Sequence, residues 1–253
     1  MHNEIITIGP VTIYGYGLMI GIGIIMALLI ACRRGRKFSL NEDIIWGITL
    51  NAVIFGFLGA KILFCISDWR NFIQNPMSAL SQNGFVVYGG IMSGALAAYI
   101  YCRIKKVNFL DYFDIVMPSI AIAQGFGRIG CFLAGCCYGR ETHSFLGVIF
   151  SHSDFAPNGV KLLPTQLFSS AGDFLLAGIL IWYASKKRAS GTVGALYLIL
   201  YSIGRFLVEI FRADERGAIF GMSTSQFISI PVLVVGIALM IYFSKRTERA
   251  EEN

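Results

Sequence analysis

Long apolar runs recur along this chain, and several of them end in a cluster of basic residues. A helix of about 20 apolar residues is long enough to cross the roughly 30 Å hydrocarbon core of a bilayer. Only 14% of the 253 residues are charged, whereas a soluble domain carries about 25% charged residues. The runs therefore predict an all-α polytopic membrane protein in which helices take up most of the chain.

Seven of these runs are long enough to be transmembrane helices. They lie at about residues 11–32, 41–66, 85–102, 112–128, 165–184, 193–210 and 225–243. If the loops alternate between the two sides, those on one side hold four, three, three and three basic residues, thirteen of the 21 Lys and Arg in the chain. Basic loops stay in the cytoplasm, so the pattern predicts seven spans, with the N-terminus outside and the C-terminus inside.

The polar segments between the runs predict the domain organisation. We expect one integral membrane domain over 1–253, with an extracytoplasmic arm at about 67–84 and a small extracytoplasmic head at about 131–163. The first apolar run comes before its basic cluster, the reverse of a secretory signal, so we expect it to be retained. Because the cytoplasmic clusters account for the net charge of +6, we expect no nucleic-acid partner.

A glycine-rich stretch at 125–140 combines features that are unusual next to a membrane span. It contains five glycines, three of the six cysteines and Arg128. Glycine lets the backbone approach a partner closely, and an arginine at the edge of a span needs an anionic or polar partner. The stretch is therefore predicted to form the mouth of a site that faces lipid.

The sixth run carries three charges on one predicted helical face, Arg205, Glu209 and Arg212, with Tyr201 four residues earlier. One interpretation is an internal ion-pair network that fixes helix packing, and it can account for Glu209 and one arginine. The other starts from the excess of cations at the depth of the outer leaflet, to which Arg128 and Lys61 also contribute. A lipid phosphate is the anion available there, and the guanidinium fork suits phosphate. We favour this second interpretation for Arg128 and Arg205.

One interpretation of Cys131, Cys136 and Cys137, with His143, is a metal site. Their spacing is not a usual zinc pattern and adjacent cysteines chelate poorly, so no metal is predicted. A disulfide between two of these three cysteines stays an alternative, because the outer face of the membrane is oxidising. The other cysteines are expected to be buried as small apolar residues.

Several motifs follow one another in the order of a known family. They are Tyr-Gly-Leu-Met at 16–19, Gly-Ala-Lys at 59–61, Tyr-Gly-Gly at 88–90, Gly-Arg-Ile-Gly at 127–130, the stretch 135–139, Pro-Thr-Gln-Leu at 164–167, Tyr201 with Arg-Phe-x-x-Glu-x-x-Arg at 205–212, and Ser-Gln and Ser-Ile-Pro at 225–231. Over nearly its full length the chain resembles the prolipoprotein diacylglyceryl transferase family.

The resemblance implies a multi-pass enzyme of the bacterial inner membrane. Such an enzyme moves diacylglyceryl from phosphatidylglycerol, a membrane lipid, to the lipobox cysteine of a prolipoprotein, and glycerol phosphate leaves. No metal or other cofactor is implied, and we expect a monomer. The catalytic candidates are Arg128, Arg205, Tyr88 and Tyr201, and the substrate-binding candidates are Arg128, Lys61, Tyr16, Gly89, Gly90, Cys131, Gly139, Glu209 and Arg212.

Three positions depart from the family pattern. Tyr88 stands where the family has a histidine, Cys131 where it has an asparagine, and Cys136 where an acidic residue is frequent. Tyrosine, with a pKa of about 10, is a poor base. Either the arginines deprotonate the incoming thiol without a base, or this is a divergent branch with another acceptor. Two further alternatives are a transferase that uses its own cysteines as a transient nucleophile and a non-enzymatic transporter or binding protein for anionic lipid.

Overall fold

The computed structural model describes residues 4–8, 11–81, 84–186, 188–214, 217–219 and 221–251, which are mostly helical. The helices are α1 Gly15–Lys37, α2 Glu42–Ser67, α3 Trp69–Gln74, α4 Pro76–Ser81, α5 Val87–Ile104, α6 Phe109–Ala134, α7 Thr165–Tyr183, α8 Thr192–Glu209 and α9 Thr224–Glu251. Three antiparallel strand pairs accompany them, namely β1 Glu4–Ile8 with β2 Val11–Tyr14, β3 Val148–Ile149 with β4 Lys161–Leu162, and β5 Ala218–Ile219 with β6 Met222–Ser223.

Six of the described helices are long and apolar enough to cross a membrane: α1, α2, α6, α7, α8 and α9. The chain is therefore a polytopic all-α membrane protein. The expected third span coincides with α5, which is not among the six. Its three tyrosines, three glycines and Arg103 lower its hydropathy. Seven spans and their orientation stay predictions.

The first predicted span begins later than expected. Its first residues, Val11–Tyr14, form strand β2 and pair with β1, and helix α1 starts only at Gly15. The β-branched residues in this segment favour a strand, and the helix then continues through the basic cluster to Lys37. The start of α2 follows its sequence signal, because the Asn41 side chain accepts a hydrogen bond of 2.8 Å from the backbone N–H of Asp43.

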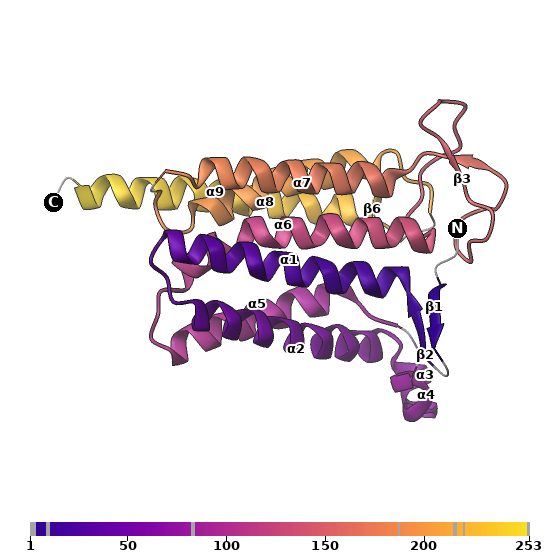
Figure 1. Cartoon of the computed structure of the whole chain (residues 1–253), viewed down its shortest axis with the longest axis horizontal. Helices are drawn as coiled ribbons and strands as arrows, with labels where there is room; N and C mark the ends of the chain where they lie inside the picture. Colours follow the sequence, from indigo (N-terminus) through magenta and orange to yellow (C-terminus); the bar gives the residue numbers. More distant parts are fainter. Residues whose placement is uncertain are drawn as a thin grey trace. The chain divides into compact units, whose positions relative to one another are not determined.

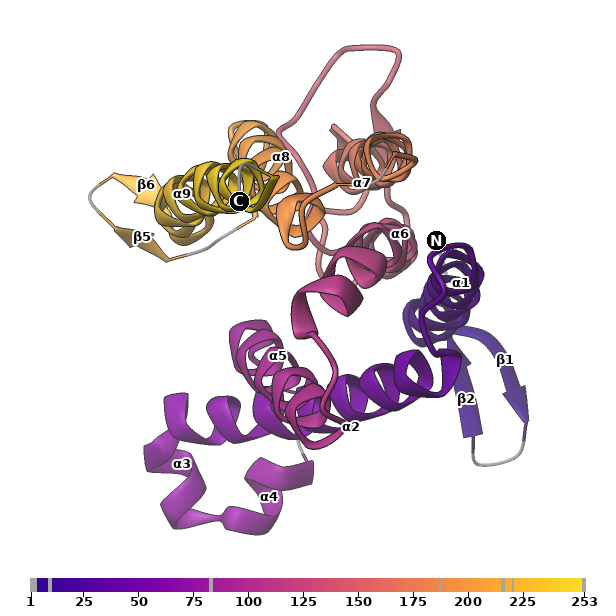
Figure 2. The same ribbon diagram turned by 90° about the vertical axis from the view of Figure 1, so that its left-hand side faces the viewer.

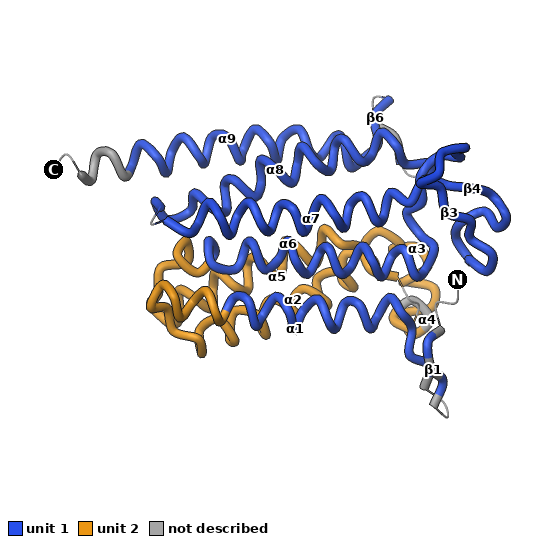
Figure 3. Tube along the Cα trace, turned by 45° about the horizontal axis from the view of Figure 1, so that its top comes forward, with its two compact units in different colours: residues 1–31, 113–253 blue, residues 32–112 orange. Residues whose placement is uncertain are grey.

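The chain forms two compact units (Figure 3), and each is described by itself. The first contains residues 1–31 and 113–253, and the second contains residues 32–112. Helices α6, α7, α8 and α9 belong to the first unit and run side by side in it (Figure 1). Helices α2 to α5 belong to the second.

The first unit has a buried apolar core where α6, α7 and α8 meet. It is formed by Met117, Ala121, Ile122, Leu176, Ala177, Leu180, Ala184, Val193 and Tyr197. At one end of this core, Asp114 of α6 accepts hydrogen bonds from the backbone N–H groups of Gly191, at 2.7 Å, and Gly194, at 2.8 Å. A carboxylate there satisfies donors at the start of α8 and opposes the positive end of its dipole. The carboxylate therefore ties α6 to α8, which lie near each other in Figure 2.

The second unit is built on close contact between α2 and α5. A Cβ atom added to Gly89 of α5 would lie 2.4 Å from the carbonyl oxygen of Gly59, and one added to Gly90 would lie 3.0 Å from that of Gly56. Ser93 Oγ also lies at this contact, 2.8 Å from the carbonyl oxygen of Phe55 on α2 and 2.7 Å from that of Gly89 on its own helix, and it can donate its one proton to either. Small residues thus let the two backbones approach, as is common between membrane helices.

The segment between α6 and α7 forms a small head with its own buried cluster, Phe150, Ala156 and Leu162. The backbone bridge from Glu141 to Leu162 lies within the head, and the bridge from Gly139 to Arg212 connects the head to the segment after α8. Helix α6 continues to Ala134, so the residues 131–134 that were expected to open the head are helical. The expected arm at about 67–84 contains the short helices α3 and α4.

Candidate active site

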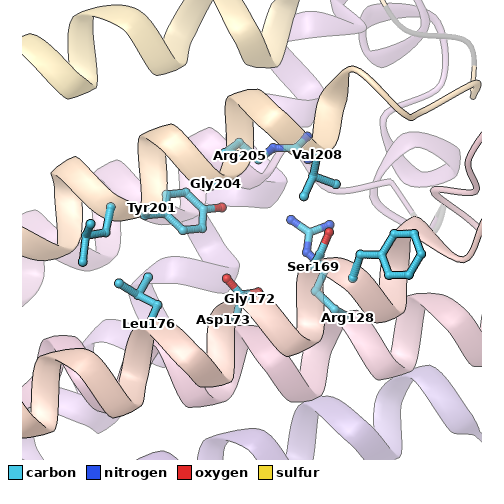
Figure 4. Close-up of a pocket in the computed structure, with 11 residues that line it drawn as sticks. Arg128, Ser169, Gly172, Asp173, Leu176, Tyr201, Gly204, Arg205 and Val208 are labelled. Carbon is cyan, nitrogen blue, oxygen red and sulfur yellow. The ribbon is translucent and has the colours of Figure 1, made fainter.

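A pocket with an empty volume of about 430 Å³ lies among α6, α7 and α8 of the first unit. Its polar lining comes from all three helices, with Arg128 on α6, Ser169 and Asp173 on α7, and Tyr201 and Arg205 on α8. Figure 4 shows the Arg128, Asp173 and Tyr201 side chains directed toward one another. Sequence positions more than 70 residues apart thus contribute to one polar pocket within apolar helices.

Arg128 lies inside a helix rather than at its end. The prediction that the span ends at Arg128 was wrong, because α6 continues for six more residues to Ala134. The neighbouring glycines lie within this helix and pack against other helices of the unit. A Cβ at Gly125 would lie 2.8 Å from Phe174 of α7, and one at Gly130 would lie 3.2 Å from Tyr16 of α1. Their close partners are therefore helices, and only Gly127 has open space beside it.

Arg128 makes no hydrogen bond and no ion pair with any residue in the described ranges. It lies three residues before Cys131 on α6 and faces the pocket. A guanidinium in a membrane span is rare unless a partner is present. This arrangement leaves its five donors available to an anion in the pocket.

Arg205 is partly satisfied by its neighbours. Its Nη2 atom lies 2.9 Å from a Glu209 carboxylate oxygen and donates a 2.7 Å hydrogen bond to Ser225 Oγ. Its Nη1 atom is buried without a hydrogen-bond partner among the described residues. A buried donor of this kind is costly unless a ligand satisfies it. The ion pair with Glu209 thus fixes the position of Arg205, and its Nη1 atom stays available to donate to a ligand.

The position of the Tyr201 ring is fixed by its contact with Tyr197. Its ring stacks on Tyr197 with centroids 5.4 Å apart and an interplanar angle of 10°. The Tyr197 hydroxyl donates a 2.9 Å hydrogen bond to Gln124 of α6. The hydroxyl of Tyr201 is directed into the pocket (Figure 4).

The prediction that Arg212 shares a helical face with Arg205 was wrong. Helix α8 ends at Glu209, and Arg212 lies beyond it in a backbone bridge with Gly139. There its guanidinium makes two 2.9 Å hydrogen bonds to the carboxylate of Asp214, while Glu209 is 3.9 Å away. Asp214 thus balances the charge of Arg212, Glu209 balances that of Arg205, and the Asp173 carboxylate lines the same pocket as Arg128. The excess of positive charge that the sequence suggested is therefore not found at the pocket, and a ligand would be bound by the hydrogen-bond donors of Arg128 and by the unsatisfied Nη1 of Arg205.

Asp173 is a pocket residue that the sequence argument missed. It lies on α7 with 8% of its surface exposed, and its carboxylate makes no hydrogen bond or ion pair within the described ranges. Unpaired carboxylates in membrane spans are rare and commonly functional. The signal was present in the sequence, because Asp173 is the only charged residue of the run 165–184.

Four candidates belong to the second unit. Lys61 on α2 lies over the Phe64 and Phe85 rings, 4.9 Å and 5.4 Å from their centroids. Tyr88 is exposed at the start of α5, and Gly89 and Gly90 pack on α2. Within this unit the two glycines allow close helix packing, and Lys61 makes cation–π interactions with the two aromatic rings.

The remaining candidates lie around the C-terminal end of α6. Tyr16 packs where Gly130 leaves room for it, and Gly139 donates a 2.9 Å backbone hydrogen bond to Leu163. Cys131 forms a cluster with Cys136 and Cys137, in which all three Sγ atoms lie within 4.8 Å of one another. No disulfide joins them.

The thiols of this cluster differ in acidity. Hydrogen bonds with the Cys131 and Cys136 thiols lower the pKa of the Cys137 thiol, and the positive charge of Arg212 lowers it further. Hydrogen bonds with Cys131 and Cys137 raise the pKa of the Cys136 thiol. The positive charge of Arg212 thus favours the charged form of Cys137, on the loop that follows α6.

The apolar helices and the pocket among them define the class of this protein, a multi-pass membrane protein with an arginine-lined pocket inside its helical bundle. The family can also be stated. The family model described as prolipoprotein diacylglyceryl transferase matches residues 3–242, so the chain belongs to the prolipoprotein diacylglyceryl transferase family.

Relatives agree with this assignment over nearly the whole chain. The phosphatidylglycerol–prolipoprotein diacylglyceryl transferase of Clostridium tetani (strain Massachusetts / E88) is 49% identical over 226 residues, which cover 89% of this chain and 91% of the relative. Phosphatidylglycerol–prolipoprotein diacylglyceryl transferase 2 of Clostridium perfringens (strain 13 / Type A) is 50% identical over 229 residues, with 90% of both chains covered. The phosphatidylglycerol–prolipoprotein diacylglyceryl transferase of Finegoldia magna (strain ATCC 29328 / DSM 20472 / WAL 2508) is 30% identical over 255 residues, which cover all of both chains.

Proposed function

We propose that this protein transfers the diacylglyceryl group of phosphatidylglycerol to the lipobox cysteine of prolipoproteins, with release of glycerol phosphate. The observation that carries the proposal is Arg128, a guanidinium inside a membrane helix that faces a pocket and has no ion-pair partner among the described residues. A phosphate ester is the anion that a lipid-facing site would meet at this position, and arginine binds phosphate through two parallel hydrogen bonds. The names of the relatives support the same donor and acceptor.

The reaction joins the acceptor sulfur to the glyceryl carbon that carries the phosphate. The carbon–oxygen bond breaks, and its electron pair leaves with the oxygen of glycerol phosphate. Arg128 and the unsatisfied Nη1 of Arg205 would stabilise the charge that grows on the phosphate oxygens, and Tyr201 would donate a further hydrogen bond. The lone carboxylate of the pocket, Asp173, would accept the thiol proton, a role for which the tyrosine at position 88 is poorly suited.

The same proposal includes a topology and a location. We place the chain in the bacterial inner membrane as a monomer with seven spans, including α5, and with the N-terminus outside and the C-terminus inside. The basic clusters within the end of α1, at the end of α5, after α7 and within the end of α9 support this orientation. We treat 1–253 as one membrane domain. Tyr88 stays a candidate for catalysis. The candidates for substrate binding also stay predictions, namely Lys61, Tyr16, Gly89, Gly90, Cys131, Gly139, Glu209 and Arg212.

The test uses the full chain reconstituted in vesicles of phosphatidylglycerol, with a peptide that contains a lipobox cysteine. Mass spectrometry of the peptide should detect a thioether-linked diacylglyceryl group, and a peptide with serine in place of that cysteine serves as the control. No product with folded protein would exclude the transferase. Under the alternatives, a lipid adduct would form on one of the chain's own cysteines, or lipid would change leaflet without any product.

A further inference from the structure

The thiols of Cys131, Cys136 and Cys137 are brought together by the end of α6 and the turn after it. Cys131 lies in the last turn of the helix, and Gly135 reverses the chain with a φ of +74°. Their Sγ atoms all lie within 4.8 Å of one another, and no other group of three or more ligand-type side chains in the described ranges is this compact. The sequence argument rejected a metal site because adjacent cysteines chelate poorly. In the structure Cys137 has a positive φ of +62°, and its Sγ nevertheless lies within 4.8 Å of the Sγ atoms of Cys136 and Cys131.

The backbone that carries two of these thiols is held by buried side chains of α7. Gln166 Nε2 donates a 2.7 Å hydrogen bond to the carbonyl of Cys136, and Thr165 Oγ1 donates a 2.8 Å hydrogen bond to the carbonyl of Cys137. Both side chains are about 1% exposed. Cys137 itself has a φ of +62°, which is unfavourable for a residue with a Cβ atom. The fold thus holds Cys137 in a strained conformation that directs its thiol toward the other two.

The dimensions of the cluster suit a metal bound by sulfur. A zinc–sulfur bond of about 2.3 Å in tetrahedral geometry places ligand sulfurs about 3.8 Å apart. The observed separations of at most 4.8 Å would therefore have to shrink by about 1 Å or less. Two cations lie close to the thiols, Arg128 one helical turn before Cys131 and Arg212, which interacts with Cys137 through its charge and a hydrogen bond. They would offset the negative charge of three thiolates around a divalent ion.

We propose that Cys131, Cys136 and Cys137 form a binding site for a soft divalent metal ion of the zinc type, with three thiolate ligands and one coordination position open to a ligand from outside this set. The metal would fix the end of α6 three residues after Arg128 and join it to the loop that carries Gly139. This site is separate from the proposed transfer reaction, which uses no metal in the scheme above.

The test measures metal binding directly on the full chain, purified under reducing conditions and stripped with a chelator. Titration with Co²⁺ should produce the thiolate-to-cobalt absorption band, and Zn²⁺ should displace it with one ion bound per chain. Replacing any one ligand, as in Cys136→Ala, should weaken binding by at least about 100-fold, since even outer-shell changes weaken metal sites by about 10- to 100-fold. Cys65→Ala, at a buried cysteine of the second unit, is the matched control and should bind as the parent does.

Thermal unfolding of each variant shows whether it is folded, and Cys→Ser versions replace any alanine variant that is not. If the reduced parent binds no more Co²⁺ than the variant without all three thiols, the proposal is wrong. It is equally wrong if the natively isolated chain contains a disulfide within the cluster and gains no metal site on reduction. Because neither measurement uses transfer activity, failure of the proposed transferase would leave the result on the metal site unchanged.

Discussion

Helices α2 and α5 contact each other through different residues from those that join helices α6, α7 and α8. In α2–α5 the contact is made by glycines and a serine, whose small size lets backbone meet backbone. In α6–α7–α8 one end is packed with apolar residues and the other carries Arg128, Asp173, Tyr201 and Arg205. Large polar side chains cannot interlock as small ones do, so a pocket of about 430 Å³ is left among them.

The comparison separates two reasons for placing an unusual residue in a membrane helix. The glycines at 89 and 90 stand in a motif that resembles a functional one, yet within their unit they have a sufficient role in packing. Arg128 makes no hydrogen bond or ion pair with a described residue, and its charge faces Asp173 and Tyr201 across a pocket rather than filling a helix contact. We therefore expect substitutions in α2–α5 to act on stability and substitutions of pocket residues to act on turnover.

The largest effect is expected from Arg128→Ala. Removing one donor that stabilises transition-state charge commonly lowers the rate by about 10²- to 10³-fold, and we expect a loss of this size in thioether formation. Thermal unfolding should change little, since Arg128 has no ion pair to lose. Arg128→Lys should recover part of the rate, because the charge returns without the planar fork. Full activity in the alanine variant would contradict the role given to this residue.

The next effect tests the ion pair that supports the pocket. Glu209→Ala leaves Arg205 buried without its 2.9 Å partner, and breaking a buried pair costs about 3–5 kcal/mol. The unfolding free energy in detergent should fall by roughly this amount. Replacing both residues, as Glu209→Ala with Arg205→Ala, should recover part of the loss, because no unpaired charge is left. Equal stability of the single variant and the parent would show that the pair is not structural.

Asp173→Asn should lower the rate of transfer by about 100-fold, a typical effect of losing a general base. The amide has nearly the same size, so folding should be retained. The loss should be recovered in part when the peptide is supplied at a pH at which its cysteine is already a thiolate. If the variant keeps the parental rate at neutral pH, Asp173 is not the base. Deprotonation of the acceptor thiol would then depend on water or on the charge of the arginines.

The smallest effect is expected in the second unit. Gly89→Ala would place a Cβ atom 2.4 Å from the Gly59 carbonyl oxygen, and overpacking of this kind costs about 1–3 kcal/mol. Gly178→Ala is the matched control, since nothing lies within 4 Å of its added Cβ atom. The midpoint temperature of thermal unfolding should fall only for Gly89→Ala. If Gly89→Ala instead kept its stability and lost turnover, the motif at 88–90 would be a binding element rather than a packing element.

Much of the fold could be predicted from the sequence, because membrane helices are defined by apolar length and by the basic residues that follow them. The sequence also identified Arg128, Tyr201 and Arg205 as site candidates, since charges in apolar runs are conspicuous. It placed Arg212 on the wrong element because the pattern i, i+4, i+7 continues past the residue where α8 ends. The ends of helices depend on local hydrogen bonds that periodicity does not describe.

The tertiary structure alone decided which of these residues meet. Asp173 is an isolated charge in the sequence and becomes the carboxylate of the pocket only because α7 packs on α6. Cys131, Cys136 and Cys137 match no usual metal-binding spacing and converge only because the backbone reverses at Gly135 and is held by Gln166 and Thr165. Sequence patterns report the environment of single elements, whereas a site depends on contacts between elements that are distant along the chain.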